Sequence, residues 1–207
     1  HTLDLTGCRG VTDVSALADS ASLHTLYLTG CRGVTDVSEL ARCASLHTLD
    51  LTGCRGVTDV SALAGCASLH TLYLSGSGVT NVSALARCAS LHTLYLIECD
   101  QVTDVSELAG CASLHTLDLT GCDEITDVNA LAVCASLHTL ILSCTGVTDV
   151  SALAGCASLH TLNLSYCDHV TDVRALAGSA SLHTLDLRHS GVTHVSALDN
   201  PNLTIYH

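Results

Sequence analysis

The chain has 207 residues, of which 48% are hydrophobic and only 2% aromatic, and its formal net charge is −13 at pH 7. Seven cationic side chains, all Arg, leave too few positive charges for the clustered cations that a phosphate-binding surface needs, so we expect no nucleic-acid partner. No run of about 18 apolar residues occurs, so we expect no membrane insertion.

The sequence consists of copies of one 23-residue unit, seen most clearly over residues 46–68. Self-similarity at such a period is typical of stacked structural repeats. Two copies, those that contain Gly78 and Gly146, lack one loop residue. We predict a single domain over residues 1–207, with nine repeats and a partial tenth at 203–207, and expect it to be a piece of a longer chain. Full copies after the first begin at Leu23, Leu46, Leu69, Leu91, Leu114, Leu137, Leu159 and Leu182.

Each copy predicts the same order of elements. Leu49 and Leu51 alternate with outward residues, which is the period-2 pattern of a half-buried strand. A Gly-containing turn follows over residues 53–56. Residues 61–64, Ser-Ala-Leu-Ala, favour a short helix, and Asp59 is a candidate N-cap for it. Stacking these units predicts an α/β solenoid whose strands form a parallel sheet with neighbours ~4.8 Å apart.

These motifs resemble the leucine-rich repeat family over essentially the whole chain. The segment Val-Thr-Asp-Val-Ser-Ala-Leu resembles the return segment of the phosphatase-regulator and internalin type. Cys54 stands where many family members have Asn, as in the cysteine-containing type. The overall sequence pattern is similar to that of leucine-rich repeat proteins of trypanosomatids. The resemblance implies a horseshoe with the parallel sheet on the concave face and short helices or turns on the convex side.

Thirteen cysteines fall into two columns of the repeat, one after the strand and one after the helical segment. A zinc site needs ligands that converge on one point, whereas equivalent residues of stacked repeats point the same way. We therefore expect no metal and interpret both columns as small buried thiols, those of the first bonding to turn carbonyls. We assign Cys8, Cys31, Cys54, Cys99, Cys122, Cys144 and Cys167 to the first column. So many unpaired thiols favour a reducing compartment, so we expect an intracellular, cytoplasmic protein.

A histidine recurs in every copy as the residue after the first leucine, as in His47 and His70. We expect an exposed ladder of imidazoles at the strand entrance. Protonated neighbours ~5 Å apart would repel by about 1 kcal/mol even in water. That repulsion is expected to lower the His pKa values and to make stability fall as the pH drops below about 6.5.

The sequence contains no arrangement that points to catalysis. Each Ser, His and Asp that could form a triad belongs to a repeated column, which favours a structural role. Each Gly falls at a repeat turn, so no phosphate-binding loop is apparent. We therefore predict that the chain is not an enzyme and that it needs no cofactor.

Positions that vary among otherwise uniform copies are the candidates for partner binding. They are the outward strand positions and the first turn position, and exposed Tyr side chains among small polar residues are typical interface anchors. The charge along the turn edge also changes sign, from Arg32 and Arg55 in early copies to Asp123 and Asp168 in later ones. This change reflects either sequence drift on a solvated loop or a surface that orients a partner along the sheet. The candidate binding residues are Tyr27, Tyr73, Tyr95, Ile97, Glu98, Ile141, Asn163, Tyr166 and Arg188.

The leading hypothesis is a non-catalytic scaffold that binds a protein partner on the concave sheet face, with the chain in a larger complex. A rigid, pre-formed surface limits the ordering entropy that opposes binding. Two alternatives remain: a targeting subunit of an enzyme complex, such as a ubiquitin ligase or a phosphatase regulator, which the family resemblance suggests, and a cell-surface adhesion domain. A flanking F-box would favour the first, and a signal sequence with disulfide-bonded caps the second.

Overall fold

The computed structural model describes residues 1–198 and 200–207 and contains one open sheet of ten parallel strands in the order of the chain. Each strand is three residues long, and equivalent residues pair, as Leu49 does with Leu26 and Leu72. The strands are β1 (Thr2–Asp4), β2 (Thr25–Tyr27), β3 (Thr48–Asp50), β4 (Thr71–Tyr73), β5 (Thr93–Tyr95), β6 (Thr116–Asp118), β7 (Thr139–Ile141), β8 (Thr161–Asn163), β9 (Thr184–Asp186) and β10 (Thr204–Tyr206). The predicted solenoid is confirmed.

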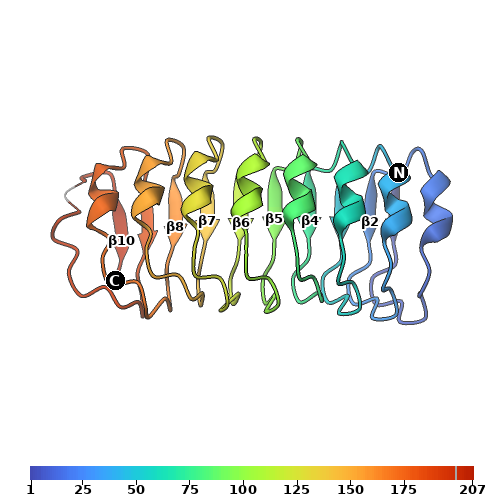
Figure 1. The fold of residues 1–207 in the computed structure, drawn as a ribbon, viewed down its shortest axis with the longest axis horizontal. Coiled ribbons are helices and arrows are strands. Elements are labelled where there is room, and N and C mark those ends of the chain that lie inside the picture. The colour runs from blue at the N-terminus through green and yellow to red at the C-terminus, as the bar shows by residue number, and fades with distance from the viewer. Residues whose placement is uncertain (199) are drawn as a thin grey trace.

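Short 3-10 helices form a second row along the molecule, in front of the row of strands in Figure 1. They are η1 (Ser15–Asp19), η2 (Ser38–Arg42), η3 (Ser61–Gly65), η4 (Ser83–Arg87), η5 (Ser106–Gly110), η6 (Asn129–Val133), η7 (Ser151–Gly155) and η8 (Arg174–Gly178). The Ala/Leu-rich segments are therefore helical as predicted, but with the tighter i→i+3 bonding that suits single short turns. None of the helices in the described residues is long and apolar enough to cross a membrane.

The acidic residue that recurs before the 3-10 helices, replaced by Asn81 before η4, makes the predicted hydrogen bond from a position one residue earlier than a true N-cap. The N-cap residue of η3 is Val60, which offers no side-chain acceptor. Asp59 Oδ1 instead accepts the backbone N–H of Ser61 at 2.7 Å, and this bond lowers the pKa of the Asp59 carboxyl. The repeated Asp thus satisfies an amide that the short helix leaves free.

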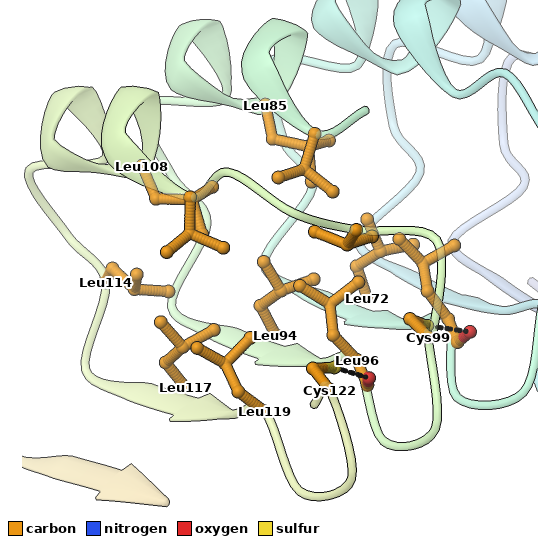
Figure 2. Packing of buried hydrophobic residues seen from close by; sticks show 14 of the residues in the cluster. Leu72, Leu85, Leu94, Leu96, Cys99, Leu108, Leu114, Leu117, Leu119 and Cys122 are labelled. Atoms are coloured by element: carbon orange, nitrogen blue, oxygen red, sulfur yellow. Dashed lines mark hydrogen bonds between the residues drawn. The ribbon is translucent and has the colours of Figure 1, made fainter. Parts of the chain in front are cut away.

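The core lies between the two rows and is built from columns of leucine, valine and cysteine. In Figure 2 the leucines of successive repeats, among them Leu72, Leu94 and Leu117, stand one behind the other. These three side chains are completely buried. Since every slot is narrow and repeated, Leu and Val fill it without aromatic residues.

Both cysteine columns donate hydrogen bonds to backbone carbonyls of the preceding repeat. Cys122 Sγ donates to Leu96 O at 3.0 Å, one of the bonds drawn in Figure 2. In the second column, Cys66 Sγ donates to Leu40 O at 3.2 Å. The prediction of carbonyl bonding for the first column therefore holds and extends to the second. Burial raises the pKa of Cys66 to about 12, so these thiols are neutral and unreactive.

One cysteine assignment was wrong. Cys144 is exposed and lies in the turn, while the buried place of the first column in that repeat is taken by Thr145, whose Oγ1 donates to Leu142 O at 2.7 Å. This repeat is one loop residue shorter than the others, and the gap falls after Thr145. Matching the repeats by their cysteines placed the gap before Cys144 instead. Cys8, in the first repeat described, is also exposed.

Replacement of Ser77 by cysteine is expected to stabilise the fold by about 1 kcal/mol. Ser77 takes the place of a first-column cysteine, and its Oγ is the one buried side-chain oxygen or nitrogen without a hydrogen-bond partner in the described part of the chain. The longer C–S bond lets a thiol reach the Leu51 carbonyl, as Cys54 reaches Leu28 O at 3.1 Å. Urea unfolding measures the change as a higher midpoint at constant slope. The opposite change, Cys54→Ser, should lower the midpoint, and a lower midpoint for Ser77→Cys would contradict this explanation.

The tenth unit is a real strand: β10 pairs with β9, so Tyr206 lies beside Asp186. The unit follows a segment, residues 198–202, that departs from the repeat, and Asp199 in that segment lies outside the described residues. The last unit has no histidine before its strand.

Candidate functional site

The in-register pairing places the third residue of every strand in one row across the outer face of the sheet. This row, here called the central row, combines acids and tyrosines with one isoleucine and one asparagine. It consists of Asp4, Tyr27, Asp50, Tyr73, Tyr95, Asp118, Ile141, Asn163, Asp186 and Tyr206. The sheet therefore offers a continuous, rigid surface rather than a single cleft.

The nine candidate binding residues do not form one compact cluster, because they are distributed from β2 to β9. Tyr27, Tyr73, Tyr95, Ile141 and Asn163 belong to the central row. The others follow their strands: Ile97 and Arg188 are the second residue after β5 and β9, and Glu98 and Tyr166 are the third after β5 and β8.

Tyr73 and Tyr95 form the one directly adjacent aromatic pair of the central row. Their rings stack with centroids 5.0 Å apart and planes 5° apart, and both are half-buried. Burial, with Tyr95 and Asp50 nearby, raises the pKa of Tyr73, so its hydroxyl is neutral at physiological pH. The pair presents an apolar surface with two hydroxyl groups, which is the composition of an interface anchor.

Acidic residues border this pair on both sides in the central row. Asp50 accepts hydrogen bonds from Thr29 Oγ1 and the Thr52 N–H, each at 2.8 Å. Asp118 is buried and accepts from the N–H of Thr120 at 2.9 Å. These local bonds hold the carboxylates in place, so the aromatic pair lies between two fixed negative charges.

A second aromatic group lies at the C-terminal end of the sheet. Tyr166 is 55% exposed and stacks on His189 with centroids 4.7 Å apart. Arg188 forms an ion pair with Asp186, which lowers the pKa of that carboxyl, and its guanidinium lies 5.6 Å from the ring centre of Tyr206. Tyr206 was missed from the sequence, although its place as third residue of the tenth strand is the signal that identifies it.

The first turn position after the strand has a left-handed backbone in many repeats, and four residues there are not glycine. Gly53 has φ 72°, whereas Glu98, Cys144, Tyr166 and His189 have φ between 56° and 59°. A non-glycine residue in this region costs on the order of 1 kcal/mol, so these repeats accept strain to present a side chain. Two of the four, Glu98 and Tyr166, are candidate binding residues.

The histidines form a stacked column along the strand-entry edge rather than a separated exposed ladder. Seven successive ring pairs, from His24 to His183, have centroids 4.3 to 4.7 Å apart and planes within 12° of parallel. Apart from exposed His24 the stacked rings are half-buried. Among the described residues, no group of three or more His, Cys, Asp or Glu is arranged to hold a metal ion.

Acidification is expected to destabilise the fold through this column. Burial first, and repulsion by neighbouring imidazoles second, lower the pKa values of His47, His92 and His138. The order of causes corrects the sequence-based expectation, which named repulsion alone. Because the unfolded chain binds protons at a higher pH, stability is complete above about pH 6.5 and falls as the pH drops through that value. Melting temperatures at pH 7.5 and 5.5 test this, and equal values would contradict it.

Comparison with known proteins identifies the fold. Family models of leucine-rich repeats match in three places: "Leucine Rich repeats (2 copies)" at residues 135–178, and "Leucine Rich repeat" at 42–64 and 110–134. No curated protein matches the sequence. An internalin C2 from Listeria monocytogenes is similar over 93% of this chain and 84% of its own, with 30% identity and a TM-score of 0.76. The chain therefore belongs to the leucine-rich repeat family, a class of protein-interaction scaffolds.

Two further solved structures share the fold at lower identity. The internalin inlF of Listeria monocytogenes aligns with 99% of this chain at 23% identity and a TM-score of 0.68. A leucine-rich repeat protein of Leptospira interrogans aligns with 92% at 16% identity and a TM-score of 0.51. The chain spans 66% and 62% of these two proteins, slightly less than two thirds of each.

Proposed function

We propose that the chain is a non-catalytic scaffold, a single domain over residues 1–207, that binds a protein partner on the outer face of its sheet. The stacked Tyr73–Tyr95 pair carries this proposal, because it is the one place in the central row where two aromatic side chains are adjacent and stack. Ile97 and Glu98 directly follow the same strand, so residues of β4 and β5 form the centre of the binding surface. Tyr166 and Arg188 form its C-terminal part.

The geometry favours binding without rearrangement. The central row is fixed by strand pairing on both sides, and the neighbouring carboxylates are held by hydrogen bonds. A partner that covers the row therefore meets side chains that have little freedom left to lose, which limits the entropy that opposes association. Aromatic residues at the centre of such a surface contribute most of the binding energy.

Truncation of the aromatic pair, Tyr73→Ala with Tyr95→Ala, is expected to weaken partner binding by more than about tenfold. A partner is first isolated from native lysate with the parent chain, and the purified pair is then titrated by calorimetry. The matched control is Glu39→Ala with Glu107→Ala, which truncates two exposed side chains on η2 and η5. Circular dichroism checks the fold of each variant. Equal affinity of both variants for the partner would contradict binding at the sheet face.

The identity of the partner separates this scaffold from its alternatives. A partner that is the catalytic or adaptor subunit of a ubiquitin ligase or a phosphatase would indicate a targeting subunit. A receptor on another cell would indicate an adhesion domain.

We also propose that the protein acts in the cytoplasm. The thirteen cysteines are unpaired in the described structure, and Cys144, in the middle of the array, is exposed to oxidants. A reducing compartment keeps such thiols free. Titration of thirteen free thiols in protein isolated from its native source supports this location, and a disulfide through Cys144 argues against it.

A further inference from the structure

The stacked histidines present a row of identical nitrogen atoms to solvent. The histidine column consists of His24, His47, His70, His92, His115, His138, His160 and His183. In the first seven, Nδ1 lies 3.1 to 3.4 Å from Oγ1 of the following Thr, and in His183 it lies 2.6 Å from Ser181 O. One ring nitrogen of each histidine is therefore occupied within the protein.

The other nitrogen, Nε2, is free to face a ligand. Within the described residues, Ser77 Oγ is the one buried side-chain nitrogen or oxygen that lacks a partner. No Nε2 of the column is thus both buried and unpaired, and these atoms reach solvent. When a ring is protonated, Nδ1–H can donate to the neighbouring Thr and Nε2–H donates outward. The column then forms a straight line of donors, one per repeat.

The stacking geometry does not suit a metal ion. A metal site requires nitrogen lone pairs that converge on one point at about 2.0–2.1 Å. Parallel rings whose centroids are 4.6 Å apart, such as His47 and His70, direct their lone pairs side by side instead. The same arrangement suits a ligand that repeats along the column, as a chain of anionic groups does.

The surroundings of the column carry few charges that could neutralise it. The segment between each 3-10 helix and the next histidine is Cys-Ala-Ser-Leu or Ser-Ala-Ser-Leu, which has no charged side chain. The nearest charged residues at the helix ends are Arg42, paired with Asp19, and Arg87.

Carboxylates of the central row lie three residues after the column, at the last residue of their strands. Asp50, Asp118 and Asp186 each accept a backbone N–H of the turn that follows their strand. The acids of the turn edge, such as Asp123, lie at the opposite end of the strands. The column therefore becomes the main cationic surface of the protein when it takes up protons.

We propose that the histidine column is a proton-dependent binding site for a linear polyanion, a chain of repeating phosphate or sulfate groups. Neighbouring imidazolium rings repel one another, so the free column resists full protonation. A chain of anions that follows the column removes this repulsion at every repeat, so binding takes up protons and strengthens as the pH falls. A single phosphate reaches too few rings to have this effect.

The first test is a titration with long-chain inorganic polyphosphate at pH 5.5 and pH 7.5. We expect the dissociation constant to be at least about tenfold lower at pH 5.5, with net proton uptake on binding. Inorganic phosphate at the same total phosphate concentration should not bind detectably. A parallel titration with heparin distinguishes phosphate from sulfate groups as the ligand. If both polymers bind, the column recognises negative charge alone; if only one binds, the column recognises the anionic group of that polymer. Equal affinity at the two pH values, or no binding at pH 5.5, overturns the proposal.

Paired variants test whether the column itself is the site. His92→Gln with His115→Gln interrupts the column at its middle, whereas His169→Gln with His194→Gln removes the same titratable groups from exposed positions elsewhere. We expect the first pair to weaken polyphosphate binding at pH 5.5 by about tenfold and the second to leave it unchanged. Equal losses in both pairs would show that net charge is responsible and would overturn the proposal. If the first pair fails to fold, the pH dependence of the parent decides.

Discussion

Leu96→Ala is expected to lower the free energy of unfolding by about 2–5 kcal/mol. Leu96 is completely buried directly after β5, and Figure 2 shows it among the leucines of neighbouring repeats. Its carbonyl oxygen accepts a hydrogen bond from the Cys122 thiol, so Leu96 contacts both the leucine and the cysteine columns of the core. Truncation leaves a void that the repeats on either side cannot fill, because each is fixed by strand pairing. Urea unfolding monitored by circular dichroism measures the loss.

The matched control for this change is Leu5→Ala, which alters the equivalent residue of the first repeat. Leu5 is only partly buried, since a repeat covers it on one side alone. Its truncation should therefore have a clearly smaller effect on the urea midpoint. Equal losses at the two positions would mean that burial between repeats is not the main source of stability.

Gly78→Ala is expected to destabilise the fold by about 3 kcal/mol. Gly78 lies in a repeat that lacks one loop residue, and the shortened turn crosses directly over the preceding repeat. A Cβ at this position would overlap the carbonyl oxygen of Arg55 and lie 3.2 Å from Thr58 Cγ2. The obstacle is backbone rather than a flexible side chain, so the turn itself must move. Thermal unfolding, with the midpoint shift converted to free energy, measures the effect.

Gly155→Ala provides the comparison for this second change. Gly155 ends η7, and a Cβ built on it meets no atom within 4 Å. The substitution should change stability by less than about 0.5 kcal/mol. If Gly78→Ala were as harmless as Gly155→Ala, close contact with the preceding repeat would not be the reason for glycine in the short turns.

The periodicity of the sequence was sufficient to predict the solenoid, because one repeat unit cannot bury its leucines alone and must stack on its neighbours. The period-2 leucines located each strand, and Thr71, Leu72 and Tyr73 pair with their equivalents on both sides as the alignment predicts. The 3-10 geometry was not predicted, since Ser-Ala-Leu-Ala favours any short helix and the length of the turn decides the type.

Errors occurred where the shape of the backbone decides which residue occupies a position. Cys144 was assigned by its identity, but its repeat is one residue short and Thr145 takes the buried place. The left-handed backbone of Glu98 and Tyr166 is not visible in their residue types, although glycine in the same place of other repeats hints at it. The ring stacking of the histidines depends on side-chain rotation, which spacing along the chain does not determine.

The candidate site was predictable as a row but not in its internal contacts. Register alone places Tyr73 beside Tyr95, and the structure adds that their rings stack. Variation among copies identifies Tyr27 and Asn163 as candidates as readily as it identifies Tyr73 and Tyr95. The sequence alone therefore could not rank these residues by their importance for binding. Tyr206 was not predicted as a binding residue because the tenth unit is too short to show the repeat pattern.

Oxidative footprinting of the tyrosines, with and without the isolated partner, tests most directly whether the sheet face binds. The five tyrosines report on different parts of that face, and Val133, which is 70% exposed on η6, reports on the helix side. We expect Tyr73 and Tyr95 to become protected when the partner binds, while Val133 keeps its reactivity. Protection of Val133 with unchanged labelling of Tyr73 and Tyr95 would place the partner on the helix side and contradict the proposed function.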